Sequence, residues 1–166
     1  AILAAEIIEI GPSSELAEKY TAENTVDCRS HVIMPGFVNT HTHMPMSLLR
    51  GLADDLRLDV WLYGYMLPVE REFVNPEFCF LGTQLSCAEM MLSGTTCFAD
   101  MYYHEEEVAW AAEQAGMRGV CGETVMTFPT PDATSYDKSL QYIADFCQRW
   151  QNHDLIVAAP ALIRLI

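Results

Sequence analysis

The stretch that decides the fold reads Pro35-Gly36-Phe37-Val38-Asn39-Thr40-His41-Thr42-His43-Met44-Pro45. Pro35-Gly36 is a turn signal, the apolar pair after it is typical of a strand start, and Pro45 ends the extended run. Because side chains alternate along a strand, His41 and His43 are predicted to point to the same side. Two adjacent imidazoles at a strand end can bind one divalent metal. The His-x-His tripeptide alone also arises by chance or from two surface histidines.

Helix and strand signals alternate after this stretch. A first helix is predicted from Leu56 to Tyr65. Asn75-Pro76-Glu77 is a strong helix start, because Asn caps, Pro fits the first turn and the acid favours the positive end of the helix dipole. The helix is predicted to end before Gly94. Apolar residues recur along it at helical spacing, namely Phe78, Leu81, Leu85, Ala88 and Leu92.

The alternation continues to the end of the chain. Strands are predicted at Thr95 to Asp100, Arg118 to Val125 and Leu155 to Ala159, and helices from Glu105 to Ala115 and from Tyr136 to Gln151. Strands separated by amphipathic helices favour parallel pairing, which predicts an α/β fold with three to four βα units. A doubly wound flavodoxin-like domain uses the same alternation. No glycine-rich phosphate loop follows a predicted strand, which argues against that alternative.

Residues 1–34 differ in pattern from the rest. Glu6 to Ile10 alternates like a half-buried strand, Glu15 to Tyr20 is a short predicted helix, and Thr25 to Cys28 is a second short predicted strand. We therefore expect a domain boundary between residues 1–34 and residues 35–166.

Composition excludes several classes of partner. The net charge of −14 argues against nucleic acid and anionic membrane surfaces, because the field repels phosphates. No apolar run reaches the roughly 20 residues that span a bilayer. The six cysteines form no CxxC pair, and most lie in apolar segments where cysteine behaves as a small hydrophobe. Together with an N-terminus unlike a signal peptide, they predict a reducing cytoplasm.

The central stretch resembles the first barrel strand of the metal-dependent amidohydrolase superfamily. Residues 44–55, Trp61-Leu62, Leu67-Pro68-Val69-Glu70 and residues 93–102 resemble its branch of methylthioadenosine/S-adenosylhomocysteine deaminases and chlorohydrolases. The resemblance implies the N-terminal part of a (β/α)8 TIM barrel, since a complete barrel takes about 250 residues. It also implies that residues 1–34 are part of a small β-sandwich domain.

The resemblance assigns roles to several residues. His41 and His43 correspond to metal ligands for a divalent ion, most often zinc, although two imidazoles suit iron or nickel as well. The family supplies a further His and an Asp from later barrel strands, after the last residue of this sequence. Glu70 corresponds to a glutamate that accepts hydrogen bonds from ribose hydroxyls. It also fits a surface acid, and Trp61 fits either stacking on a heterocycle or core packing.

Two further strand ends carry polar residues. At Glu123, many members of the branch place an arginine that binds the far end of the substrate. An anion cannot pair with a homocysteine carboxylate, so Glu123 as a substrate-binding residue disfavours S-adenosylhomocysteine. Asp100 ends the second strand and His104 lies just beyond it; they could orient the histidine pair, or serve as loop-capping and helix N-terminal residues.

The expected function is metal-dependent deamination, or less often dechlorination, of an aromatic nitrogen heterocycle such as an adenosine derivative. Guanine, cytosine and triazines are alternative substrates of the same class. The other alternative is a non-catalytic partial domain that binds metal weakly through two histidines. A small-molecule heterocycle is the expected partner, and homo-oligomers are possible.

Overall fold

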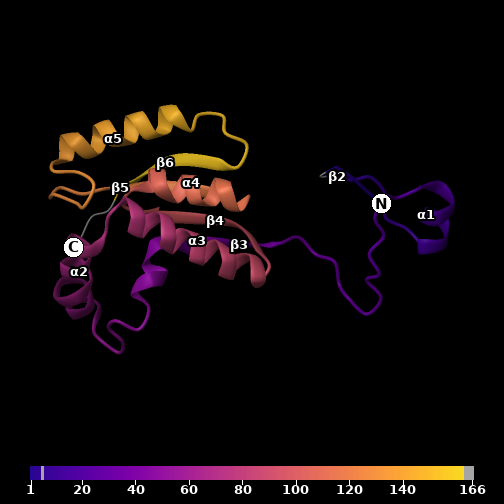
Figure 1. The fold of residues 1–166 in the computed structure, drawn as a ribbon, viewed down its shortest axis with the longest axis horizontal. Coiled ribbons are helices and arrows are strands. Elements are labelled where there is room, and N and C mark those ends of the chain that lie inside the picture. Colours follow the sequence, from indigo (N-terminus) through magenta and orange to yellow (C-terminus); the bar gives the residue numbers. More distant parts are fainter. Residues whose placement is uncertain (5, 163–166) are drawn as a thin grey trace. The chain divides into compact units, whose positions relative to one another are not determined.

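The computed structural model describes residues 1–4 and 6–162. The chain divides into two units, Ala1–Pro35 and Gly36–Ile166. The second unit contains four parallel strands in the order β3 (Phe37–Thr42), β4 (Thr95–Tyr102), β5 (Arg118–Val125) and β6 (Ile156–Leu162) (Figure 1). This arrangement confirms the predicted α/β fold with parallel pairing.

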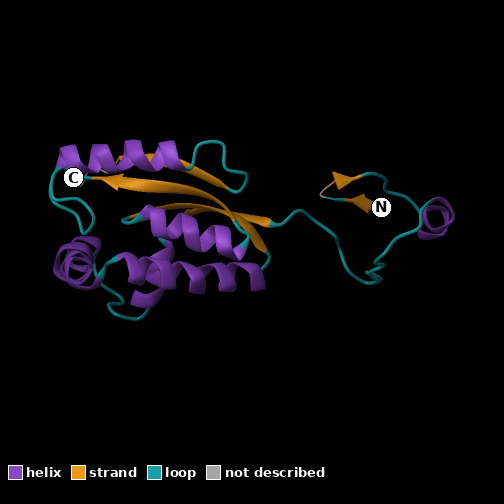
Figure 2. Cartoon of the chain, turned by 45° about the horizontal axis from the view of Figure 1, so that its top comes forward, coloured by secondary structure: helices purple, strands orange, loops and turns teal. Residues whose placement is uncertain are grey.

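Helical segments connect the strands (Figure 2). Between β3 and β4 lie a 3-10 helix η1 (Met44–Leu49), a π-helix η2 (Val60–Met66), α2 (Leu67–Phe73) and α3 (Pro76–Leu92). Helices α4 (Glu105–Ala115) and α5 (Tyr136–Arg149) make the next two crossovers. The predicted start of α3 is confirmed, because Asn75 accepts the Phe78 N–H at 3.0 Å. Gly94 follows with a φ of +82°, a left-handed conformation that favours glycine.

All three long helices pack against one face of the sheet. Phe98 of β4, Cys121 of β5 and Ile156 of β6 lie on that face and are fully buried. They form a core with residues of α3, α4 and α5, namely Cys87, Val108, Ala109, Ala112, Phe146 and Trp150. Right-handed crossovers between neighbouring parallel strands place their helices on the same side. The opposite face of the sheet is covered by none of α3, α4 and α5.

The large apolar residues that recur along α3 are not its most buried ones. Leu81, Leu85 and Leu92 are 49%, 39% and 91% exposed. The side that packs on η1 and α4 instead carries small residues, Cys79, Gly82, Thr83, Ser86 and Cys87. Gly82 lies so close to η1 that a Cβ there would be 2.5 Å from the Pro45 carbonyl oxygen. Small residues are needed on this side because the backbones of α3 and η1 approach closely. The spacing of the large apolar residues does not reveal that approach.

Two expectations need correction. The helix predicted from Leu56 to Tyr65 begins at Leu58 and continues through η2 and α2 as far as Phe73. Residues 25–28 form no strand in the described structure, since an extended segment becomes a strand only when its backbone finds a pairing partner.

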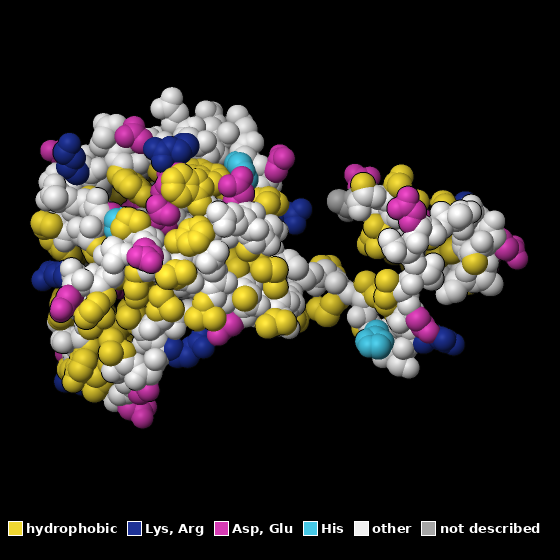
Figure 3. Space-filling view, in the orientation of Figure 1, with side chains coloured by type: hydrophobic (Ala, Val, Ile, Leu, Met, Phe, Trp, Pro, Cys, Tyr) yellow, Lys and Arg dark blue, Asp and Glu magenta, His cyan; other side chains and the backbone are white. Residues whose placement is uncertain are grey.

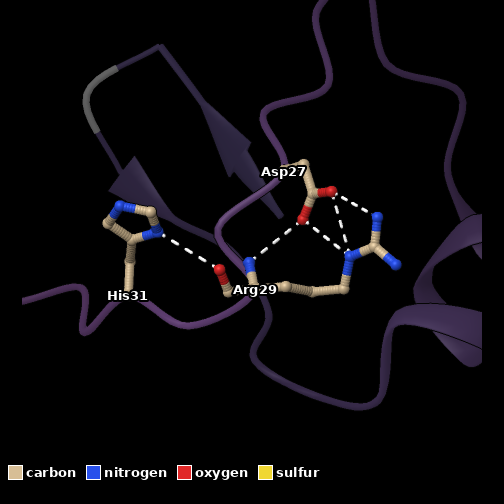
Figure 4. Close-up of polar contacts among 3 residues, drawn as sticks. All are labelled: Asp27, Arg29 and His31. Atoms are coloured by element: carbon tan, nitrogen blue, oxygen red, sulfur yellow. Dashed lines mark hydrogen bonds and ion pairs between the residues drawn. The ribbon is translucent and has the colours of Figure 1, made fainter.

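The first unit is small and mostly exposed. Strands β1 (Ile2–Leu3) and β2 (Glu6–Ile7) pair antiparallel, and α1 (Ser13–Lys19) follows. Figure 4 shows Arg29 bound to both carboxylate oxygens of Asp27 and accepting a bond from His31 at its carbonyl oxygen. Exposed ion pairs of this kind contribute at most about 1 kcal/mol. His31 is thus accounted for by a local loop contact.

Candidate functional site

The two histidines of β3 lie side by side. Their ring centroids are 5.2 Å apart, with the rings at 78° to one another. His41 is exposed and His43 is half-buried, so neither is enclosed in a dry core. The sheet register shifts between Asn39 and Thr42, which marks a bulge just where the histidines begin. The structure therefore places the pair as the alternation predicts, together and accessible.

A hydrogen bond fixes the tautomer of His43. Its Nδ1 lies 2.5 Å from the carbonyl oxygen of Met101 at the end of β4. Because a carbonyl oxygen only accepts, the ring must carry its proton on Nδ1. The other ring nitrogen, Nε2, then presents a lone pair. This is the state in which a histidine binds a metal.

A pocket of about 140 Å³ opens beside His43. His43, Trp61 and Glu70 line it, so three of the residues singled out from the sequence meet in one cavity. The remaining lining is largely apolar and includes four methionines; it consists of Met46, Leu62, Met66, Leu67, Met101, Tyr102, Tyr103, Thr124 and Met126. No cationic side chain lines the pocket among the described residues.

Glu70 is the charged group of this pocket. It is only 6% exposed, and its Oε1 accepts a hydrogen bond from the Tyr102 hydroxyl at 2.9 Å. Burial raises the pKa of the Glu70 carboxyl, and the bond from Tyr102 opposes that rise. The alternative of Glu70 as a surface acid is therefore wrong. The rest of its carboxylate can accept bonds from a ligand.

Glu123 lies away from the pocket. It lies near the end of β5 on the helix-bearing face, is 1% exposed, and accepts the Glu105 N–H at 3.0 Å through Oε2. Burial and the neighbouring Asp132 raise its pKa well above the ordinary value. The described pocket thus shows no contact between Glu123 and a substrate cavity. Its role in binding stays a prediction.

Three buried carboxyl groups form what we call the acid cluster: Asp100, Glu105 and Glu123. Asp100 Oδ1 accepts the Met44 N–H at 2.8 Å, whereas its Oδ2 and both Glu105 oxygens find no donor in the described part of the chain. Burial raises the pKa of Asp100 to about 7 and that of Glu105 well above its ordinary value. The two carboxyls lie within hydrogen-bond reach, so a proton on one satisfies the other.

Sequence reasoning missed several residues of the site. Tyr102 lies two residues beyond the predicted end of β4, and its bond to Glu70 is a contact across 32 positions. The methionines of the pocket come from four separate segments and share no spacing. The run Glu105-Glu106-Glu107 begins a predicted helix, and nothing in the sequence indicated that two of the three are buried.

The described residues supply two imidazoles for a metal, and they hold no cluster of three or more potential ligands. Two neighbouring imidazoles suit a divalent ion of the zinc type. A catalytic zinc ordinarily has three protein ligands. The pair therefore fits as part of a metal site that needs further ligands.

Residues 32–162 match the model of the amidohydrolase family, and the chain belongs to that family. It is 42% identical over 94% of its length to a 5-methylthioadenosine/S-adenosylhomocysteine deaminase of Syntrophus aciditrophicus, and 44% identical over the same share to one of Syntrophobacter fumaroxidans. It spans about 35% of the length of each of these relatives.

Among solved structures, an adenosine deaminase from Xanthomonas campestris with bound zinc is similar, with 43% identity and a TM-score of 0.76. The similarity covers 78% of this chain and 29% of that one. The expected N-terminal part of an amidohydrolase-type (β/α)8 barrel is thereby confirmed. In the described residues, none of the helices has the length and apolar character needed to cross a bilayer.

Proposed function

We propose that the protein to which this chain belongs is a metal-dependent hydrolase that deaminates an aromatic nitrogen heterocycle of the adenosine type. The observation that supports this most is the meeting of His43, Trp61 and Glu70 in one pocket, with His41 beside it. A site that binds and deaminates a nucleoside needs a metal ligand, an aromatic side chain and an anion that accepts hydrogen bonds.

Each residue contributes a separate interaction. His41 and His43 would hold a divalent ion, most often zinc, and when bound it lowers the pKa of water and so makes a nucleophile available at neutral pH. Glu70 accepts hydrogen bonds from the ribose hydroxyls and so orients the base toward the histidines. Trp61 stacks on the heterocycle. The remaining ligands and the general acid and base come from beyond the described residues.

We further propose a neutral thioether or alkyl substituent on the substrate. The pocket beside His43 is apolar, contains four methionine thioethers and lacks a described cationic side chain. A homocysteine carboxylate placed there would be desolvated without a partner, which is costly. Methylthioadenosine is therefore expected to react faster than S-adenosylhomocysteine. Ammonia release from the two nucleosides, measured on the full-length protein, decides this, and a clear preference for S-adenosylhomocysteine contradicts it.

The first experiment is metal analysis of the full-length protein and of its His41→Ala/His43→Ala variant. The double variant is expected to lose the bound ion and to lose turnover of adenosine by several orders of magnitude, because the nucleophile depends on that ion. His31→Ala is the matched control, since His31 lies in the first unit and its ring hydrogen-bonds the Arg29 carbonyl oxygen. Unchanged metal content in the double variant would refute the ligand assignment. Metal analysis also separates zinc from iron or nickel.

Three expectations remain proposals alongside this function. Residues 1–34 would belong to a small β-sandwich domain and residues 35–166 to the barrel. The cysteines are all free thiols, which fits a reducing cytoplasm. Homo-oligomers are compatible with the exposed hydrophobic side chains visible in Figure 3 (yellow), although remaining parts of a barrel would cover such surfaces equally well.

A further inference from the structure

The peptide unit that follows His43 is held from both ends. Asp100 Oδ1 accepts the Met44 N–H at 2.8 Å, and the Ser86 hydroxyl donates to the Met44 carbonyl oxygen at 2.8 Å. Met44 itself has no exposed surface. Hydrogen bonds in such an enclosed place are strong, and losing a partner leaves an unsatisfied backbone group. This turn, which sets the direction of His43, is therefore rigid.

The same kind of hydrogen bond, from a backbone N–H to a carboxylate, occurs one strand further along. Glu123 Oε2 accepts the Glu105 N–H just as Asp100 accepts the Met44 N–H. In the sheet, Thr42 pairs with Asp100 and Tyr102 pairs with Glu123. Thus in β4 and in β5 a carboxylate near the strand end accepts a first N–H of the helix that follows the preceding strand. The repetition shows that Asp100 occupies a defined structural position.

Two consecutive residues of β4 act on His43 from different sides. Asp100 holds the backbone after it, and Met101 accepts the proton of its ring Nδ1. A shift of the Met44 peptide would move the ring away from the Met101 carbonyl, since both depend on the same strand end. The bond that fixes the tautomer thus depends on the bond that fixes the turn.

We propose that Asp100 is a positioning residue for His43: through the Met44 N–H it holds the ring against Met101, so that Nε2 is presented to the metal. The inference rests on the proposed metal site. Asp100 lies on the helix-bearing face and is 5% exposed, so it acts through the backbone and does not touch the pocket.

The substitutions Asp100→Ala and Asp100→Asn separate this role from others. Alanine removes the acceptor of the Met44 N–H. Asparagine keeps an acceptor oxygen there and directs its amide donor toward Glu105, whose oxygens have no donor in the described structure. The full-length D100A protein is expected to bind zinc 10- to 100-fold more weakly, the usual loss when a group that orients a ligand is removed. D100N is expected to bind zinc as the wild type does.

A second readout needs no metal. In the metal-free protein, ¹⁵N NMR of labelled histidine reports the ring tautomer, and the His43 signal is assigned by its absence from His43→Ala. Wild type and D100N are expected to show the proton on Nδ1. D100A is expected to show an average of both tautomers, because the ring is no longer held against Met101.

Ile156→Ala is the control for stability. Ile156 lies in the core of β6, so the variant loses stability without touching the Met44 peptide, and its zinc affinity should not change. Equal zinc affinity and an unchanged tautomer in D100A overturn the proposal. A loss of affinity that simply follows stability in D100A and I156A overturns it too.

If the wild type binds no zinc, the proposed function fails, and the tautomer comparison still decides the role of Asp100. Should D100A not fold, Ser86→Ala replaces it, since Ser86 holds the other end of the same peptide. A wild-type tautomer spectrum for Ser86→Ala then counts against the proposal.

Discussion

Glu70 and Glu105 are both buried glutamates near strand ends, yet their surroundings differ. Glu70 faces the pocket, accepts a bond from Tyr102 and has carboxylate capacity to spare. Glu105 is fully enclosed between the sheet and the helices, and neither of its oxygens meets a donor in the described structure. Whether a buried carboxylate binds a ligand or stabilises the fold therefore depends on its access to solvent and on nearby hydrogen-bond donors. Its position near a strand end matters less.

The comparison extends to the pocket and the acid cluster. His43 and Met101 line the pocket, while the acid cluster lies among the helices and the buried side of the sheet. Charge in the pocket can be paired with a substrate. A charge buried among the helices must be neutralised by a shared proton, or it lowers the free energy of unfolding.

Removal of the Glu70 charge is expected to have the largest effect. Glu70→Gln loses charge-assisted bonds to two ribose hydroxyls, each worth about 1.5–3 kcal/mol, so kcat/KM for adenosine should fall by roughly 10²- to 10⁴-fold. With 2′,3′-dideoxyadenosine, which lacks those hydroxyls, wild type and variant should be nearly equal. Steady-state kinetics on the full-length protein with both nucleosides measures the difference.

Glu72→Gln is the matched control, because Glu72 is exposed on the same helix α2. It should leave both rates unchanged. An equal loss of kcat/KM with both nucleosides in Glu70→Gln would mean that Glu70 only supports the fold. Glu70 and Glu105 would then not differ in role.

Glu105 should instead show its effect in the pH dependence of stability. Its pKa in the folded state is raised, so above the ordinary carboxyl pKa the folded protein keeps a proton that the unfolded chain releases. The free energy of unfolding therefore falls as pH rises, by up to about 1.4 kcal/mol per pH unit for one group. Glu105→Gln removes this dependence, so its advantage over wild type should grow from pH 5 to pH 8.

Urea unfolding at several pH values measures this advantage. Glu107→Gln, in the same turn but partly exposed, should show a smaller pH-dependent difference. A constant gap between Glu105→Gln and wild type across this range would show that the carboxyl is already ionised in the folded protein. The distinction drawn between the two glutamates would then be wrong.

Gly82 tests how tightly the helix layer supports the histidine turn. An alanine Cβ at this position would meet the Pro45 carbonyl oxygen at 2.5 Å and the Pro45 Cα at 2.8 Å. We expect Gly82→Ala to cost about 1–3 kcal/mol of stability through overpacking, although helix propensity alone favours alanine by about 1 kcal/mol. Gln84→Ala, on the exposed side of α3, should be nearly neutral. Urea unfolding of both variants checks this, and a stabilised Gly82→Ala contradicts the close approach.

Local signals made much of this fold predictable. Asn75 and Gly94 mark the two ends of α3, and both signals are local because capping and left-handed conformations depend on a few neighbouring residues. The side-by-side placement of His41 and His43 follows from the alternation of a single strand. Such features need no knowledge of distant parts of the chain.

Features that depend on long-range packing were not predictable. The spacing of the leucines of α3 predicts a helix but not its buried side, where Gly82 packs on Pro45 while Leu85 is 39% exposed. The acid cluster exists only because the β4–β5 register places Glu105 against Glu123. Glu70 and Trp61 were found through the family resemblance, and the sequence around them gives no comparable physical signal.

Trp61 should show the smallest effect. It is half-buried on η2 and lines the pocket, so both stacking on a heterocycle and packing explain it. Trp61→Phe keeps an aromatic face but reduces its area, and we expect KM for adenosine to rise two- to fivefold, equivalent to less than about 1 kcal/mol. Trp110→Phe on the exposed side of α4 is the control and should leave KM unchanged. If Trp61→Phe lowers the urea midpoint while KM stays constant, Trp61 is a packing residue. The proposed contact with the ligand then rests on Glu70.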